Sequence, residues 1–155
     1  WEGAMPTKTK RWTYDTSLSW SQELEGELAS PGLSGLAFGA PPEFGGKPGR
    51  WGPETLLLGA VESCTLLTFL ALARRKGVVC TAYRSSAVGT LAADEEGLIR
   101  FTEVVIRPVV RVKQPADEET VRTLFQDVPK RCFIGASLKA EPRIEPVVEV
   151  EGATG

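Results

Sequence analysis

The stretch GPETLLLGAVESCTLLTFLALARRKGV, residues 52–78, decides the fold. Pro53 suits the first position of a helix, and Glu54 lies where the helix dipole favours a negative charge. Apolar side chains then recur at helical spacing up to a basic run, and Gly77 is suited to end the helix. Because the segment is apolar nearly all round, it predicts a long helix at the centre of the domain.

The sequence before this helix predicts a small antiparallel sheet. Residues 11–20, RWTYDTSLSW, alternate polar and apolar side chains, which is typical of a half-buried strand. Residues 23–29 alternate again and predict its hairpin partner, and a short third strand is expected at 33–38. Residues 39–52, GAPPEFGGKPGRWG, are so rich in glycine and proline that they predict a long loop. Loops of this length in a compact domain are often functional.

The sequence after the helix predicts a second, longer hairpin. Residues 78–93 and 97–112 have the composition of two long strands, and the acidic turn DEEG joins them. Pro108 indicates that the second strand lies at a sheet edge or carries a bulge. A second helix is expected from Asp117, with its apolar face formed by Val121, Leu124, Phe125 and Val128. A short irregular or helical piece and a closing strand follow, at residues 132–140 and 143–151. This order of elements predicts an α+β fold.

Length and composition indicate one domain of ordinary globular type. The chain has 155 residues, of which 42% are hydrophobic and 25% charged. The only methionine is Met5, so Trp1 to Ala4 is interpreted as an extension added for expression. Residues 1–10 are expected to comprise this extension and a flexible amino terminus, and residues 11–155 to form the single domain.

Charge and hydropathy exclude some classes of partner. A formal net charge of −2 with interspersed signs argues against nucleic acid, and no basic run is long enough to indicate a membrane surface. The apolar stretch Leu56 to Ala73 is interrupted by Glu62, Ser63 and threonines, so we expect it to be too short and too polar to span a membrane. Three cysteines without a dense framework fit a reducing compartment, and the cytoplasm is expected.

The residue inventory narrows the possible chemistry. The chain contains no histidine, which removes Ser/His/Asp and Cys/His hydrolases and most zinc sites with nitrogen ligands. It has no Cys-x-x-Cys pair and no glycine-rich nucleotide motif. We therefore expect neither a metal nor a cofactor.

The three cysteines have different sequence contexts. Cys64, inside the apolar helix, is either a small core residue or a reactive thiol, and periodicity alone leaves both open. Cys132 follows Lys130 and Arg131, whose positive charge is expected to favour a thiolate. Cys80 begins a predicted strand, where a structural role is expected.

Two separate segments resemble the OsmC/Ohr family. Residues 52–78 resemble its central helix, with a Pro-Glu entry, an apolar run, a cysteine and a basic end. Residues 128–150, VPKRCFIGASLKAEPRIEPVVEV, resemble its second-cysteine segment and final strand, and residues 97–112 fit the strand between them. Order and spacing agree over essentially Arg11 to Val150. The resemblance implies antiparallel sheets packed around the long helix and a second helix, in an intertwined homodimer.

The resemblance also implies a thiol-dependent peroxidase with an antioxidant role in stress response. Cys64 matches the peroxidatic position and Cys132 the resolving position. An organic hydroperoxide would oxidise Cys64 to a sulfenic acid, which would condense with Cys132, and an external dithiol would reduce the disulfide. The family's active sites lie in an apolar pocket at the subunit interface. Candidate lining residues near the matched segments are Trp51, Phe44 and Phe133, which could equally pack core and interface.

One departure from the family pattern concerns activation of the thiol. The family pairs its reactive cysteine with a glutamate, matched by Glu54, and with an arginine from the amino-terminal strands. The matching region here, residues 19–29, contains no arginine, so Arg50 is the candidate substitute. A first-turn helix glutamate that offsets the helix dipole explains Glu54 equally well. Without a cation beside it, a thiol in apolar surroundings is expected to have a raised pKa.

Three readings of function therefore remain open. The first is the peroxidase with Cys64, Cys132, Glu54 and Arg50 as site residues. The second is an OsmC-like domain that binds an apolar small molecule without peroxidase chemistry. The third is a purely structural domain with three inert cysteines.

Overall fold

A computed structural model describes residues 9–153 of the chain. The predicted flexible terminus at residues 1–10 therefore lies mostly outside the described residues. The chain divides into two compact units, Trp1–Pro53 and Glu54–Gly155, which we call the amino-terminal and carboxy-terminal units. Each unit is described by itself.

The elements confirm the predicted α+β fold class. The amino-terminal unit contains three strands and a short 3-10 helix, which are β1 (Ser17–Gln22), β2 (Glu25–Ala29), β3 (Leu36–Gly39) and η1 (Pro42–Phe44). The carboxy-terminal unit contains essentially all of the long helix and six further elements, which are α1 (Pro53–Arg75), β4 (Cys80–Ala93), β5 (Ile99–Val112), α2 (Asp117–Arg131), α3 (Phe133–Ala136), β6 (Arg143–Ile144) and β7 (Val147–Val150).

The amino-terminal unit is the predicted antiparallel sheet, in the order β1-β2-β3. The long loop after β3 returns to it, because Gly39 N–H donates to the Trp51 carbonyl at 2.9 Å. Every residue of β1 is exposed, so the prediction of a half-buried strand is wrong for the single chain. The alternation is present, but the amino-terminal unit by itself does not cover the apolar side chains of this strand.

The sheet of the carboxy-terminal unit is built on the long β4–β5 hairpin. The two strands pair antiparallel along nearly their whole length, and β6 and β7 both pair parallel to the other side of β5. Strand β5 is therefore central, and the register shifts lie elsewhere, so the edge or bulge predicted from Pro108 is wrong. Pairing with β6 ends at Ile106 and pairing with β7 begins at Val109, which places Pro108 where the third-strand ladder is interrupted.

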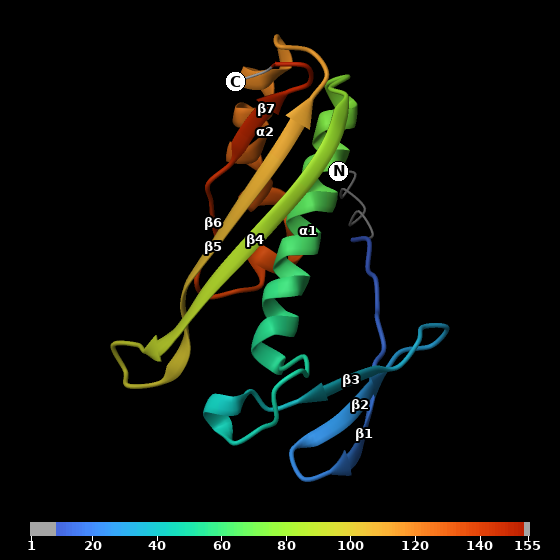
Figure 1. Cartoon of the computed structure of the whole chain (residues 1–155), viewed down its shortest axis with the longest axis vertical. Helices are drawn as coiled ribbons and strands as arrows, with labels where there is room; N and C mark the ends of the chain where they lie inside the picture. The colour runs from blue at the N-terminus through green and yellow to red at the C-terminus, as the bar shows by residue number, and fades with distance from the viewer. Residues whose placement is uncertain (1–8, 154–155) are drawn as a thin grey trace, which may run out of the picture. The chain divides into compact units, whose positions relative to one another are not determined.

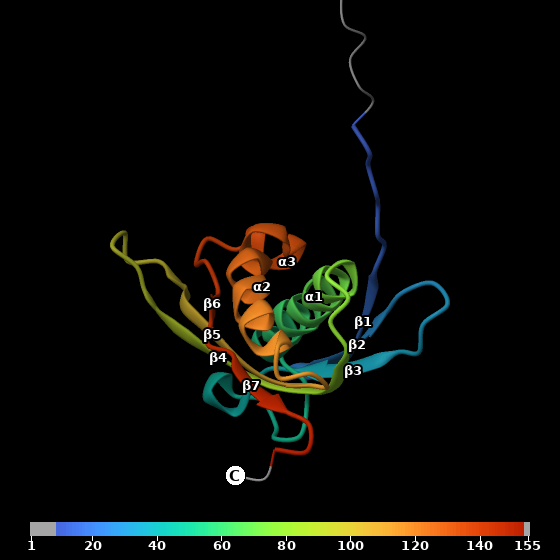
Figure 2. The same cartoon turned by 90° about the horizontal axis from the view of Figure 1, so that it is seen from above.

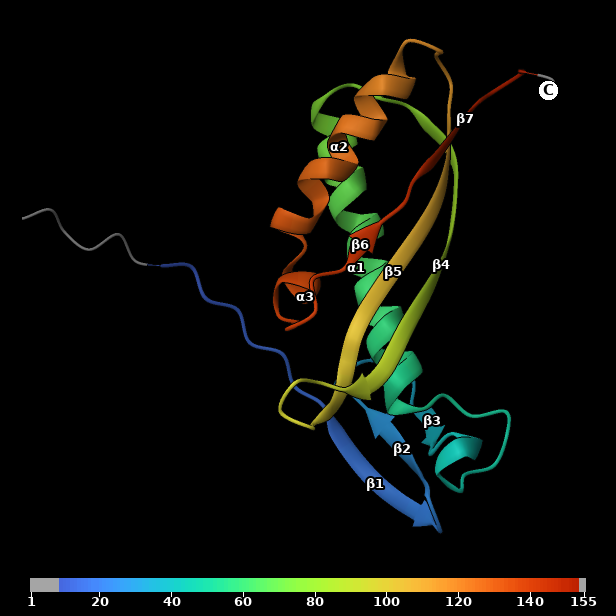
Figure 3. The ribbon, with the colours of Figure 1, turned by 90° about the vertical axis from the view of Figure 1, so that its left-hand side faces the viewer.

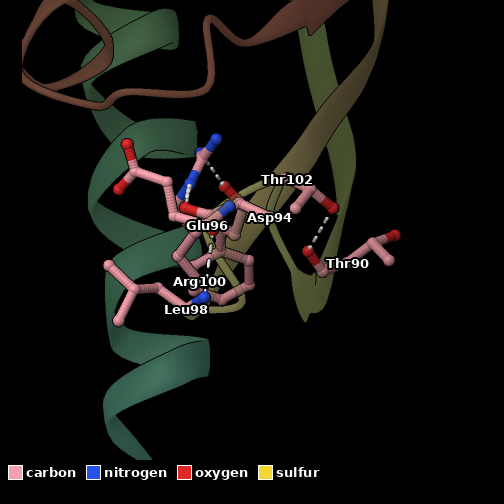
Figure 4. Close-up of polar contacts among 7 residues, drawn as sticks. Thr90, Asp94, Glu96, Leu98, Arg100 and Thr102 are labelled. Atoms are coloured by element: carbon pink, nitrogen blue, oxygen red, sulfur yellow. Dashed lines mark hydrogen bonds and ion pairs between the residues drawn. The ribbon is translucent and has the colours of Figure 1, made fainter.

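Asp94 closes the hairpin turn. Its carboxylate accepts hydrogen bonds from the backbone N–H groups of Glu96 and Leu98 and from Arg100 Nε, at 2.9, 3.0 and 2.8 Å (Figure 4). The hydrogen bonds, led by that from Arg100, hold the pKa of the Asp94 carboxyl below its ordinary value. Gly97 supplies the left-handed residue of the turn, at φ 81°. The turn therefore fixes the register of the two strands that pack against α1.

Helices α1 and α2 pack on the concave side of the curved β4–β5 surface (Figures 1 and 2). The main core joins Phe69 of α1 with Val110 of β5 and Phe125 of α2. The Phe69 and Phe125 rings stack at a centroid distance of 4.4 Å and an interplanar angle of 7°. These contacts fix α2 against α1, and α3 follows directly at the end of α2 (Figure 3).

Helix α1 begins and ends as predicted, but much of its surface is uncovered. Its buried residues form a single stripe of Val61, Thr65, Phe69 and Ala73, while Leu67 is 66% exposed. An 18-residue window of α1 has a mean hydropathy of 2.0 with 22% of it buried, so by length and composition the helix could cross a membrane. The expectation that this stretch is too short and too polar was therefore wrong on both length and composition. A core helix of a water-soluble protein passes the same test.

Candidate active site

The carboxy-terminal unit brings Cys64 and Cys132 together. Cys64 lies in the middle of α1, and Cys132 lies between α2 and α3, where it caps the amino end of α3. The Cys132 side chain is 3% exposed and belongs to the main core cluster, and Cys64 is partly buried against that cluster. Both cysteines are free thiols. The two residues matched to the family's cysteine pair are therefore neighbours in space.

The surroundings of Cys64 favour its thiolate. Burial acts to raise the pKa of this thiol, but it is outweighed by hydrogen bonds from the Ile134 N–H, the Cys132 thiol, the Thr68 hydroxyl and the Phe133 N–H. The resulting pKa lies below the ordinary value for cysteine. The expectation of a raised pKa was wrong, because backbone donors at the start of α3 and neighbouring side chains stabilise the anion without an arginine.

Cys132 has the opposite character. Burial raises its pKa, and the neighbouring Cys64 adds to this effect. The Cys132 sulfur accepts a hydrogen bond from Gly135 N–H at 3.4 Å, which does not reverse the direction. The prediction that Lys130 and Arg131 favour a thiolate at Cys132 is therefore wrong: both side chains are exposed, whereas the sulfur faces the core.

Cys80 lies at the first residue of β4 and is partly buried against the same core. Burial, with a contribution from Asp117, raises its pKa. These features fit the structural role expected for Cys80. Within residues 9–153 no group of three or more His, Cys, Asp or Glu side chains is placed to hold a metal ion.

A pocket of about 550 Å³ opens beside Cys64. Its apolar lining comes from α1 and from Phe133 at the start of α3, and its lining residues are Cys64, Leu67, Thr68, Ala71, Leu72, Arg75, Lys130, Arg131 and Phe133. Of the three aromatic residues predicted for a pocket, Phe133 lines this one. Phe44 and Trp51 belong to the amino-terminal unit.

The other two predicted site residues are not among the residues that line this pocket. Arg50, in the amino-terminal unit, pairs with Glu25 at 3.8 Å between Nη2 and Oε2. Glu54 is in the first turn of α1, and its Oε2 is buried without a hydrogen-bond partner among the described residues. Ten residues of helix separate Glu54 from Cys64, which is about 15 Å along the axis. Glu54 therefore does not contact the thiol of its own chain.

Sequence reasoning missed the groups that lower the pKa of Cys64. Thr68 lies one turn further along α1, with its Oγ1 4.0 Å from the Cys64 sulfur, and the i, i+4 spacing could have indicated it. The N–H groups of Phe133 and Ile134 belong to the backbone, so no residue type in the sequence indicates them. Only the tertiary placement of α3 against α1 reveals them.

The pKa directions predict a selective pH profile for alkylation. A depressed pKa means that Cys64 is ionised at lower pH than an ordinary thiol, while Cys80 and Cys132 ionise at higher pH. With iodoacetamide, we expect the rate at Cys64 to reach its midpoint below the pH found for glutathione. Peptide mass spectrometry across pH 5–10 measures each site. A Cys64 midpoint at or above that of glutathione would contradict this assignment.

Comparisons with known proteins agree with the fold. The sequence model of the family described as OsmC-like protein matches residues 45–147. An OsmC-like protein of unknown function from Vibrio cholerae has 21% sequence identity and a TM-score of 0.83, over 88% of this chain and 100% of that one. The comparison with curated proteins finds no significant match.

Two further solved structures carry functional names. An organic hydroperoxide resistance protein from Elizabethkingia anophelis is 15% identical with a TM-score of 0.70, over 94% of this chain and 100% of that one. An organic hydroperoxide resistance protein OsmC from Legionella pneumophila is 15% identical with a TM-score of 0.68, over 92% and 100%. At these identities the similarity shows the fold. With the family match over residues 45–147, the chain belongs to the OsmC-like protein family.

Proposed function

We propose that the protein is a thiol-dependent peroxidase that reduces organic hydroperoxides. The observation that carries this proposal is the pairing of two thiols with opposite pKa shifts beside an apolar pocket. The thiol with the lowered pKa, Cys64, lines the pocket, as an attacking nucleophile must. Cys132, whose thiol has the raised pKa, is buried beside Cys64 and would react only in the second step.

The proposed reaction has three steps. The Cys64 thiolate attacks the terminal oxygen of ROOH, the O–O bond breaks, and the alkoxide takes a proton from water to leave as ROH. The resulting sulfenic acid condenses with the Cys132 thiol, forming the Cys64–Cys132 disulfide and releasing water. An external dithiol then reduces this disulfide to two thiols and becomes a disulfide itself.

A homodimer is part of the proposal. The exposed apolar side chains of α1 and the wholly exposed strand β1 are surfaces that a second copy would cover. Glu54 fits the same idea: since it lies about 15 Å along α1 from the thiol of its own chain, any contact with a reactive thiol requires a second copy. The roles of Arg50 and Glu54 as site residues remain predictions. The assignment of residues 11–155 to one domain also remains a prediction.

The cysteines also bear on the compartment in which the protein is proposed to work. Three free cysteines, one of them with a lowered pKa, fit the reducing cytoplasm.

The alternative of a small-molecule-binding domain without peroxidase chemistry rests on the missing amino-terminal arginine. Backbone donors at Cys64 replace that cation, which favours the peroxidase.

Replacing Cys132 tests the resolving step. In Cys132→Ser, Cys64 is still oxidised by the first equivalent of cumene hydroperoxide, but its sulfenic acid has no neighbouring thiol. We expect steady-state turnover with a dithiol reductant to fall at least about tenfold, because the second step loses its intramolecular advantage. A dimedone adduct at Cys64, seen by mass spectrometry, identifies the stalled sulfenic acid.

Cys80→Ser is the matched control, since it removes the third thiol at an equal change in size. It should keep full turnover and give no dimedone adduct. Full turnover in Cys132→Ser, with no adduct, would reject Cys132 as the resolving residue.

A further inference from the structure

We propose that Thr65 assists the second step of the reaction: its hydroxyl turns from the Val61 carbonyl to the Cys132 sulfur as that sulfur loses its proton. This inference rests on the peroxidase function proposed above and assigns a further residue to its resolving step. It concerns the interior of the carboxy-terminal unit, where each thiol of the pair has a threonine of α1 beside it.

Thr65 interrupts an otherwise apolar stripe of α1. The other buried residues of the helix are Val61, Phe69 and Ala73. Thr65 is 1% exposed and is, across residues 9–153, the only buried residue with a hydroxyl, amide or charged side chain. Valine has the same branched shape without a polar atom, so packing of the stripe does not require a hydroxyl. The hydroxyl has to be explained by what it contacts.

The Thr65 hydroxyl has two acceptors within reach. It donates to the Val61 carbonyl at 2.8 Å, the bond that threonine commonly makes to the residue four positions earlier in a helix. It also lies within hydrogen-bonding reach of the Cys132 sulfur. A hydroxyl has a single hydrogen on a turning O–H bond, so it can change from one acceptor to the other. The Val61 carbonyl is then still served by the Thr65 backbone N–H of the helix.

The Cys132 sulfur is enclosed between α1 and the start of α3. Gly135 N–H donates to it at 3.4 Å, and a Cβ at Gly135 would lie 3.3 Å from it, so glycine permits this close approach. Burial raises the pKa of the Cys132 thiol, whereas hydrogen bonds from Gly135 and Thr65 act in the opposite direction. Because Cys132 is only 3% exposed, donors of the protein must replace water around a thiolate there.

The second step needs such a donor. While Cys64 is a thiolate, the Cys132 thiol donates to it and keeps its own proton. Once Cys64 is a sulfenic acid, the Cys132 thiol must give up this proton for its sulfur to attack. The S–S bond then forms, the S–O bond breaks, and the departing hydroxide takes a proton and leaves as water. Donation from Thr65 stabilises the attacking thiolate.

Thr68 provides the comparison, because it serves the other thiol. Its Oγ1 is 4.0 Å from the Cys64 sulfur, one helical turn further along α1. Loss of the Thr65 hydroxyl and loss of the Thr68 hydroxyl should therefore affect different steps of the reaction.

The test measures both steps in the full chain. Disulfide formation is followed by acid quenching and mass spectrometry at increasing concentrations of cumene hydroperoxide. The initial slope of the rate reports the first step, and the plateau reports the second. In Thr65→Val we expect the plateau at neutral pH to fall about tenfold with the slope unchanged, and the deficit to shrink as rising pH ionises Cys132. In Thr68→Val the slope should fall and the plateau should remain.

Thr65→Ser is the control for packing, since it keeps the hydroxyl and removes the methyl group. It should retain most of the plateau, and thermal melting checks the folding of all three variants. An unchanged plateau in folded Thr65→Val would overturn the inference. Equal losses in Thr65→Val and Thr65→Ser would also overturn it, because the effect would then come from packing.

A titration without peroxide separates this inference from the peroxidase proposal. Isotope-labelled cysteine reports the ionisation of Cys132 by NMR in the reduced protein. The titratable group that faces Cys132 is Cys64 of α1, while Lys130 and Arg131 of α2 are exposed, and all three are the same in both proteins compared. A higher midpoint in Thr65→Val, with no disulfide formed by any hydroperoxide, would support the Thr65 hydrogen bond and end the peroxidase proposal. Disulfide formation with the same midpoint and plateau in both proteins would support the peroxidase and reject the role of Thr65.

Discussion

Replacing Cys64 with serine is expected to reduce hydroperoxide consumption at least about 10³-fold, because the variant loses the only thiol among the residues that line the pocket. A serine hydroxyl is essentially un-ionised at neutral pH, and an alkoxide oxygen does not yield the sulfenic acid on which the second step depends. Loss of the first step leaves the reductant without a disulfide to reduce. The measurement is the rate of loss of cumene hydroperoxide in the presence of a dithiol.

The neighbouring Ser63→Ala serves as the control for Cys64→Ser. Ser63 is exposed, and its hydroxyl donates only to the Ala60 carbonyl at 3.1 Å, so its removal should leave turnover unchanged. Both variants should melt within a few degrees of the unaltered protein. Turnover retained by folded Cys64→Ser would end the peroxidase proposal and favour the binding alternative.

Phe69→Ala is expected to lower the free energy of unfolding by about 3–5 kcal/mol. The Phe69 side chain is fully buried, stacks on Phe125 of α2 and lies 6.1 Å from the Tyr83 ring of β4 between centroids. Its removal leaves a cavity between three elements that cannot all close on it. Urea denaturation followed by far-ultraviolet circular dichroism measures the change.

The same substitution should also weaken the site. Phe69 and Phe125 hold α1 against α2, and α2 leads directly into Cys132, so a loosened contact separates the two thiols more often. We expect disulfide formation by hydroperoxide to slow in Phe69→Ala. Phe133→Ala is the control for stability, since that ring is 79% exposed and should cost within about 0.5 kcal/mol. Equal losses of stability in the two variants would contradict the assigned core.

The elements that the sequence predicted well are those with strong local signals. Helix α1 has a proline at its start, a continuous apolar run and Gly77 at φ 70° after its end, and its bounds followed from these residues. The β4–β5 hairpin followed from two long strand patterns around the turn that Asp94 closes. The pairing of Cys64 with Cys132 came from resemblance to a family, because nothing local links residues so far apart.

The features that the sequence did not reveal depend on tertiary placement. Pro108 predicted a sheet edge. Strand β5 is nevertheless central, because β6 and β7 pair with different parts of the side of β5 that faces away from β4. Lys130 and Arg131 are adjacent to Cys132 in sequence, but their side chains line the pocket while the sulfur is buried. The donors that lower the pKa of Cys64 are largely backbone groups of α3, which no sequence pattern marks.

The surfaces of α1 and β1 show a further limit of reasoning from one chain. Their apolar patterns predicted burial, whereas the single chain leaves Leu67 and the whole of β1 exposed. An apolar pattern in a sequence marks any surface that is buried in the functional assembly, whether the same chain or another chain buries it. They therefore fit the proposed homodimer better than a monomer.

The most direct measurement is a count of free thiols in the reduced protein before and after one equivalent of cumene hydroperoxide, with peptide mapping of any new disulfide. The proposed cycle predicts the rapid loss of two thiols and a single link between Cys64 and Cys132, with Cys80 still free. Three unchanged thiols, or a link that includes Cys80, would contradict the account.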